Sequence, residues 1–149
     1  MTDRAPGLTL GALVVFLLAM ASPAPADGSI HRATLPLPAR AAAASQLDLV
    51  VDQIDLPRDR AAKFYVYAAG AGGPDALLGS FAVLAESRDA AGVHRVGPFH
   101  VNVTRTLRRW MDRNPGAREV PLVVKAMDGA RNPVPMTIGS VRFEIPKPR

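Results

Sequence analysis

The chain has 149 residues, of which 48% are hydrophobic and 21% charged, and its net charge is +5. This length suits one domain with a tail, and the absence of cysteine excludes disulfides, iron–sulfur clusters, thiolate zinc sites and cysteine nucleophiles. The basic residues form no continuous run and aromatic residues make up only 5% of the chain, so we expect no nucleic-acid binding. An acidic partner or an ordinary solvated surface accounts better for the charge.

The first 26 residues have the pattern of a signal peptide. Arg4 precedes an apolar stretch from Leu8 to Ala21, and small residues follow at Ala24 and Ala26. The stretch is shorter than the roughly 20 residues that a bilayer-spanning helix needs. We therefore predict cleavage after Ala21 or Ala26 and a secreted or periplasmic protein that meets a membrane only through an uncleaved signal.

Residues 27–45 are rich in proline and alanine and lack alternating apolar positions. This composition predicts a flexible or extended Pro/Ala-rich tether. The folded domain is then expected over residues 46–146.

Within the domain, short apolar runs are separated by turn residues about every ten positions. Strands are predicted within 47–54, 63–68, 79–86, 93–103, 119–127 and 136–145. This spacing predicts an all-β fold, an antiparallel β-sandwich or barrel-like domain. The inward positions change parity between Ile138 and Val141, which predicts a bulge at Gly139.

One short helix is predicted after the strand that ends at residue 103. Thr104 is the expected N-terminal cap, Leu107 and Trp110 share the packing face, and Asn114 and Pro115 end the helix. The arginines of this segment are expected to point outward.

The histidines give only weak candidates for a metal site. His94 and His100 share a strand face, but six residues in an extended strand separate them by roughly 20 Å. His31 lies in the predicted tether. With three histidines in all, the chain has too few imidazoles for a type-3 dicopper centre.

Two further metal hypotheses rest on methionine and aspartate. Met111, Met127 and Met136 could hold Cu(I), although filling of the core explains them better. Asp48 and Asp52 share a strand face but lack the spacing of a calcium loop. No nucleophile–base pair can be assembled, so we expect neither a cofactor nor an enzyme activity.

Four collinear stretches carry a resemblance to a known family. They are Lys63-Phe64-Tyr65-Val66, Gly72-Gly73-Pro74-Asp75, Gly79-Ser80-Phe81 and the segment Met136–Glu144, which contains Gly139. In this order they resemble the C-terminal domain of plant-type polyphenol oxidases, a group that includes tyrosinases and catechol oxidases. The family signature Lys-Phe-Asp-Val has Asp at the position of Tyr65. The similarity covers about residues 47–145.

In that family the domain is a β-rich lid that packs over the copper-bearing domain and keeps the enzyme latent. The resemblance implies that this chain is a non-catalytic lid, chaperone or accessory subunit, separately encoded, of a tyrosinase-like dicopper oxidase. The loop over Gly70–Leu78 is the candidate covering element. The expected partner-facing residues, in this loop and on an exposed tyrosine face, are Gly70, Gly72, Gly73, Pro74, Asp75, Leu77, Tyr65 and Tyr67.

Two alternatives stay open. The chain could be a generic secreted β-sandwich that binds another protein or a saccharide, because a fold does not determine a function. It could also carry copper, provided that His94 or His100 meets a methionine in space.

Overall fold

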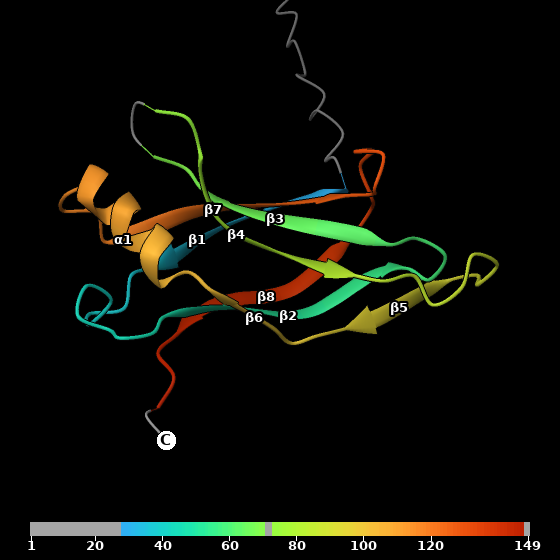
Figure 1. Ribbon diagram of the computed structural model, residues 1–149, viewed down its shortest axis with the longest axis horizontal. Coiled ribbons are helices and arrows are strands. Elements are labelled where there is room, and N and C mark those ends of the chain that lie inside the picture. The colour runs from blue at the N-terminus through green and yellow to red at the C-terminus, as the bar shows by residue number, and fades with distance from the viewer. Residues whose placement is uncertain (1–27, 71–72, 148–149) are drawn as a thin grey trace, which may run out of the picture.

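The computed structural model describes residues 28–70 and 73–147, which form two antiparallel sheets and one helix (Figure 1). The strands are β1 (Ile30–Pro36), β2 (Asp48–Pro57), β3 (Ala62–Ala68), β4 (Ala76–Val83), β5 (Val93–Val96), β6 (Phe99–Asn102), β7 (Glu119–Met127) and β8 (Thr137–Glu144). The helix α1 (Thr104–Arg113) joins β6 to β7. The predicted class, an antiparallel all-β domain with one short helix, is confirmed. The signal peptide predicted over residues 1–26 lies outside the described residues.

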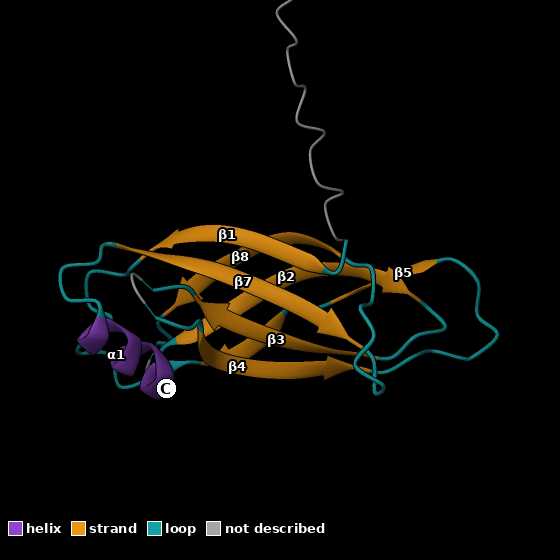
Figure 2. Ribbon diagram, turned by 90° about the horizontal axis from the view of Figure 1, so that it is seen from above, coloured by secondary structure: helices purple, strands orange, loops and turns teal. Residues whose placement is uncertain are grey.

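The strands form two layers (Figure 2). The first sheet has the order β1-β7-β3-β4. In the second sheet β2 is central, with β8 along one edge and β5 and β6 along the other. At the open sides β1 approaches β8, and β4 approaches β6. The two sheets therefore make a sandwich and do not close into a barrel.

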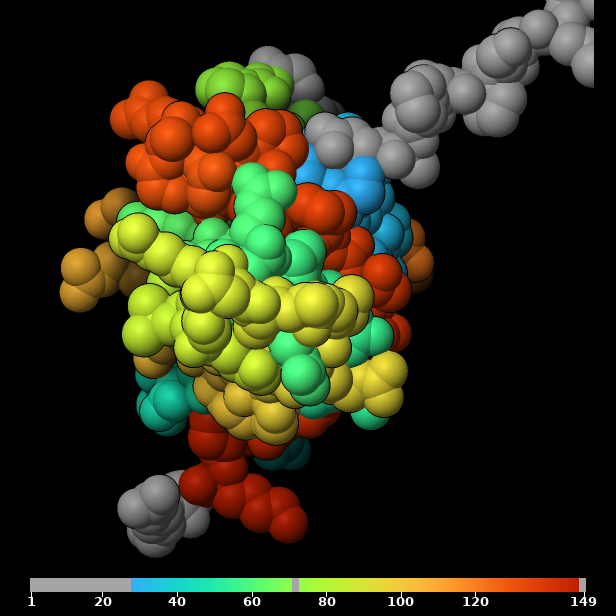
Figure 3. Space-filling view, turned by 90° about the vertical axis from the view of Figure 1, so that its right-hand side faces the viewer, coloured from blue at the N-terminus to red at the C-terminus, as the bar shows by residue number. Residues whose placement is uncertain are grey.

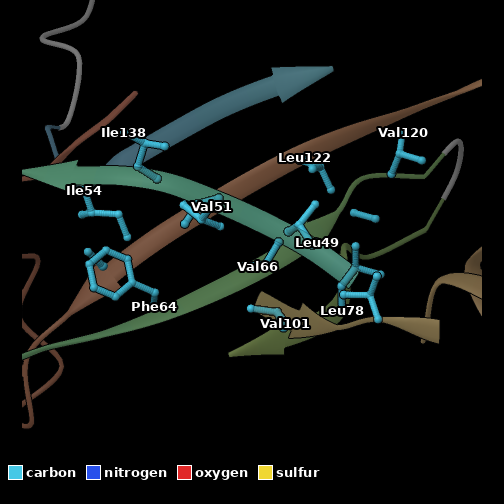
Figure 4. Packing of buried hydrophobic residues seen from close by; sticks show 14 of the residues in the cluster. Leu49, Val51, Ile54, Phe64, Val66, Leu78, Val101, Val120, Leu122 and Ile138 are labelled. Carbon is cyan, nitrogen blue, oxygen red and sulfur yellow. The ribbon is translucent and has the colours of Figure 1, made fainter. Parts of the chain in front are cut away.

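The core lies between the inner faces of the two sheets (Figure 4). From β2, Leu49, Val51 and Ile54 are fully buried, and from β3 so are Phe64 and Val66. Complete burial of a side chain of this size contributes roughly 1.5–3 kcal/mol to folding. A single apolar core is consistent with a domain that has no disulfide to stabilise it.

Three stacked phenylalanine rings connect the sheets where β4 approaches β6. Phe81 of β4 stacks on Phe64 at 4.8 Å between ring centroids and on Phe99 of β6 at 4.7 Å. Next to this stack, a Cβ atom at Gly79 would lie 2.5 Å from Cγ1 of Val101. Two of the family-signature positions, Gly79 and Phe81, therefore set how closely the sheets approach.

The tether predicted over residues 27–45 is wrong for much of its length. Residues 30–36 form β1, an edge strand paired along its whole length with β7. Pro36 ends this strand at the sheet edge, where a missing N–H is tolerated. Ala41 and Ala44, in a hydrogen-bonded turn, are also buried in the core. The sequence did not predict this strand, because its inward positions are only weakly apolar and give no clear alternation of apolar and polar residues. These positions are His31, Ala33 and Leu35.

In the second sheet, the alternation of inward-facing and outward-facing side chains shifts by one residue, and neighbouring strands do so at the same level. On β2, Val51 and Ile54 are both buried although they are three residues apart, because Gln53 between them has a positive φ of 49°. At the same level the expected long strand 93–103 divides into β5 and β6 at Gly97-Pro98. The single strand predicted over 93–103 is therefore two strands, which meet at a proline that cannot donate to the ladder.

The bulge predicted at Gly139 is wrong. The pairs Val51–Val141 and Ile54–Ile138 follow the same register, so β8 contains no extra residue. The parity change is shared by β2 and β8, because Gln53 lies opposite Gly139 in that register. A Cβ atom on Gly139 would lie only 3.1 Å from Cβ of Gln53, so glycine leaves the space that Gln53 occupies.

Helix α1 packs by the face that the sequence predicts, with Leu107 and Trp110 buried. Its start differs: Thr104 is the first helical residue and does not cap the helix. The Thr104 hydroxyl instead accepts a hydrogen bond from the Leu47 N–H at 2.8 Å and so ties the helix to the start of β2. No helix in the described part of the chain is long and apolar enough to cross a membrane.

We predict that G79A destabilises the domain by about 1–3 kcal/mol in a urea unfolding titration, because the added methyl group forces β4 away from β6. G129A is the matched control, since a Cβ atom there meets nothing within 4 Å. Equal stability of the two variants would contradict the close approach.

The docking of β1 predicts a lowered pKa for His31. Burial disfavours the imidazolium, so the pKa of His31 lies below its ordinary value in the folded protein. The contribution of neutral His31 to the unfolding free energy is then fully present above its pKa in the unfolded chain, about 6.5. This contribution is lost as the pH falls through the pKa of His31 in the folded protein. An NMR titration of His31 measures this directly. An ordinary pKa would mean that β1 is undocked.

Candidate partner-binding surface

The predicted tyrosines lie side by side on the outer face of β3. Both rings are half-buried. Tyr65 pairs across strands with Ser80, and Tyr67 pairs with Leu77 of β4. The structure therefore brings Tyr65, Tyr67 and Leu77 onto one continuous surface, although nothing in it tests their contact with a partner.

A register shift in β4 gives Leu77 its orientation. The β3–β4 ladder shifts between Val66 and Tyr67, which leaves Leu78 as an extra residue on β4. Leu78 turns into the core, whereas Leu77 points outward and is 48% exposed. The sequence prediction placed both leucines in a loop, but β4 already begins at Ala76. The loop itself is therefore shorter than predicted.

The tyrosine face is cationic as well as aromatic. The Lys63 ammonium lies 5.1 Å from the Tyr65 ring centroid, and the Lys125 ammonium lies 5.3 Å from that of Tyr67. Lys125 was missed because it belongs to β7, and only the pairing of β3 with β7 brings it next to the tyrosines. This face is less apolar than the exposed tyrosine patch that the sequence predicted.

The loop between β3 and β4 protrudes at the end of the sandwich that carries α1 (Figure 1). Gly73, Pro74 and Asp75 are exposed, and Gly72 lies outside the described residues. The indole N–H of Trp110 donates to the Ala69 carbonyl at 3.1 Å and fixes the base of the loop to the helix. A cleft of about 250 Å³ separates loop from helix; its lining includes Gly70, Gly73, Pro74, Trp110 and Arg113. Trp110 thus connects the start of the loop to the helix.

The histidines do not converge. His94 is buried, and its Nδ1 lies 2.9 Å from a Glu86 carboxylate oxygen. The prediction that His94 and His100 share a strand face is wrong, because His94 pairs with the buried Leu56 and shares its inward face. His100 is exposed on β6. Among the described residues, no group of three or more His, Asp or Glu side chains could hold a metal ion.

The other candidate ligands have structural positions. Met111 and Met136 pack against the core, and Met127 ends β7. Asp48 accepts hydrogen bonds from the Gln46 amide at 3.1 Å, and Asp52 accepts from Ser140 and Arg142. Core packing accounts for Met111 and Met136, and hydrogen bonding accounts for Asp48 and Asp52.

Two carboxylates have a lowered pKa, each from a local partner. The Arg95 guanidinium hydrogen-bonds Asp55 across the β2–β5 pair and lowers the pKa of that carboxyl. The backbone N–H of Asn132 is the main cause of the lowered pKa of Asp128, with Arg60 adding to it. Both groups hold neighbouring segments together, one across a strand pair and one across the turn after β7.

No protein-family model and no curated protein matches the chain. Two solved polyphenol oxidase structures share its fold. Latent aurone synthase (polyphenol oxidase) from a natural source aligns with a TM-score of 0.53 and 14% identity over 80% of this chain and 25% of that chain. The recombinantly expressed latent enzyme aligns with a TM-score of 0.54 and 14% identity, and the alignment again covers 80% of this chain and 25% of that chain.

The chain thus spans about a quarter of the length of these polyphenol oxidases. This partial coverage fits the resemblance of its sequence to their C-terminal domain. At 14% identity the likeness establishes the fold alone.

The Trp110–Ala69 hydrogen bond leads to a prediction about the loop. W110F removes the N–H donor and part of the buried ring, so we expect a loss of about 1–3 kcal/mol in unfolding free energy. We also expect faster hydrogen exchange of the Ala69 N–H, which donates to the Pro121 carbonyl at 2.8 Å and loses the neighbouring support of the indole. M111L, which alters a half-buried neighbour, is the control and should leave that amide protected. Unchanged exchange in W110F would show that the bond to Pro121 holds the start of the loop without the indole.

Proposed function

We propose that this chain is a non-catalytic β domain that covers the active-site entrance of a type-3 copper oxidase, as a latency, chaperone or accessory partner. The observation that carries the proposal is the fold shared with latent aurone synthase, a polyphenol oxidase seen in two structures, over four fifths of this chain and one quarter of that enzyme. The collinear sequence resemblance over residues 47–145 supports it independently.

The shape of one end of the sandwich supports a covering role. A lid needs an element that projects from a rigid frame, because a mobile element would lose conformational entropy on docking. The loop after β3 projects beside α1, and the Trp110 hydrogen bond anchors its base (Figure 1). Leu77 next to this loop offers an exposed apolar side chain to a partner.

The cationic tyrosine face adds a chemical condition on the partner. Lys63 and Lys125 each lie over one ring face, which a stacking sugar would have to share with a cation. A protein surface with acidic and apolar groups fits this face better than a neutral saccharide does. We therefore favour a protein partner over the saccharide-binding alternative.

The test is a capture experiment followed by an oxidase assay. The tagged chain is incubated with native exported proteins of its own source, and the captured proteins are identified by mass spectrometry. We expect one histidine-rich dicopper oxidase whose rate of phenol oxidation falls when the chain is added. Capture of proteins without a dicopper oxidase would favour a generic exported binding module.

Two leucine variants decide whether the proposed surface makes the contact. We predict that L77D weakens binding to the captured oxidase at least about tenfold, because it places a charge in an apolar contact. L84D is the matched control, since Leu84 is 80% exposed just beyond the other end of β4 and lies outside the surface. Equal loss in both variants would place the contact elsewhere.

A further inference from the structure

Four arginines form one stripe along the outward face of α1. They are Arg105, Arg108, Arg109 and Arg113, and all are exposed. Their spacing of three and four residues puts them on the side opposite the buried Leu107 and Trp110. We refer to them as the arginine stripe.

Among the described residues, no stripe arginine has a carboxylate partner, a property that single arginines elsewhere share, such as Arg32 on β1; what sets the stripe apart is that α1 gathers four such arginines on one face. The paired arginines are Arg58, Arg60, Arg95 and Arg142, each with a carboxylate oxygen within 4.0 Å. Over residues 28–70 and 73–147, no ion pair within 4.0 Å joins a stripe arginine to a carboxylate. Even Asp112, which lies on the same helix face, makes none.

The stability of the helix does not explain the stripe. The first turn of α1 contains no acidic residue, and Arg105 stands there, close to the positive end of the helix dipole. Arginines three and four residues apart repel one another. Arg108 has one local role, as it donates to the Ala44 carbonyl. Arg113, in the last turn, is favoured by the negative end of the helix dipole. The charges of Arg105 and Arg109 have no such explanation and repel each other unless an anion lies between them.

A cleft accompanies the stripe. Its volume is about 560 Å³, and Arg105, Arg108 and Arg109 line it together with Asp112 and polar groups of Ser45, Asn102 and Thr104. The far end of the stripe reaches the proposed covering loop, because Arg113 lines the smaller cleft beside that loop. From Arg105 to Arg113 the helix rises about 12 Å, which is longer than a single small anion.

We propose that the arginine stripe docks a carboxylate-rich segment of the partner protein. The proposal rests on the proposed function and names the chemistry of that partner's contact. Guanidinium groups bind carboxylates in a bidentate manner, and several of them along one face fit successive acidic side chains. Asp112 within the stripe disfavours the denser charge of phosphate or sulfate groups more than that of single carboxylates. The continuity of stripe and loop places this contact beside the covering element.

The test uses the full chain and an oligo-glutamate peptide as the probe, with binding measured at low salt and at about 0.5 M salt. Screening at high salt should remove most of the affinity. We expect R105Q/R109Q to bind at least about tenfold more weakly, with an unchanged or higher Tm because the repulsion is relieved. R88Q/R131Q is the control. It removes the same charge from exposed arginines at the opposite end of the sandwich, which faces the viewer in Figure 3.

Two results would overturn the proposal. Equal weakening in both double variants would mean that only net charge attracts the peptide. Stripe-dependent binding of heparin without binding of oligo-glutamate would assign the stripe to a sulfated glycan. The capture experiment remains separate: stripe-dependent peptide binding without capture of a copper oxidase would reject the proposed function and leave an acidic docking segment in place.

Discussion

The close approach of β4 to β6 is the contact on which the rest of the domain depends. Without disulfides, the two sheets are held by packing alone, and this seam is one of the two sides at which they approach each other. Gly79 permits the approach because it has no side chain to meet Val101, and Phe81 fills the space beside it between Phe64 and Phe99. The same strand, β4, then leads back to the protruding loop, so the seam also positions the candidate surface.

Positive charge is distributed unevenly over the sandwich. Several arginines outside α1 have carboxylate partners, such as Arg95 with Asp55 and Arg60 with Asp128. These pairs link segments that are distant in the sequence. The α1 end instead presents guanidinium groups without such partners in the described chain, next to the loop. One end of the sandwich thus combines a projecting loop, an exposed leucine and a concentrated positive charge.

The likeness to latent polyphenol oxidases gives this arrangement a functional context. It covers most of this chain and only a quarter of theirs, and it concerns the fold. The signature positions have a structural explanation here: Gly79 and Phe81 set the spacing of the sheets, and Gly139 makes room for Gln53. At the departure from the signature, Tyr65 has the Lys63 ammonium over its ring. Gly79, Phe81 and Gly139 thus act in the packing of the two sheets, and the proposed covering role concerns the surface residues.

The sequence alone determined the strands with strong alternation and the packing face of the helix, because these depend on local periodicity. Phe64 and Val66, Val120 and Leu122, and Leu107 and Trp110 are all buried as their spacing predicts.

Tertiary structure decided the rest. Residues 30–36 become a strand only because β7 offers an edge, and His94 turns inward only because it pairs with Leu56. The parity change at Gln53 and the extra residue Leu78 in β4 follow from pairing between strands, which a single strand's pattern does not contain. The candidate surface shows the same division, since its tyrosines follow from β3 alone, whereas the Lys125 ammonium reaches them only through the β3–β7 ladder.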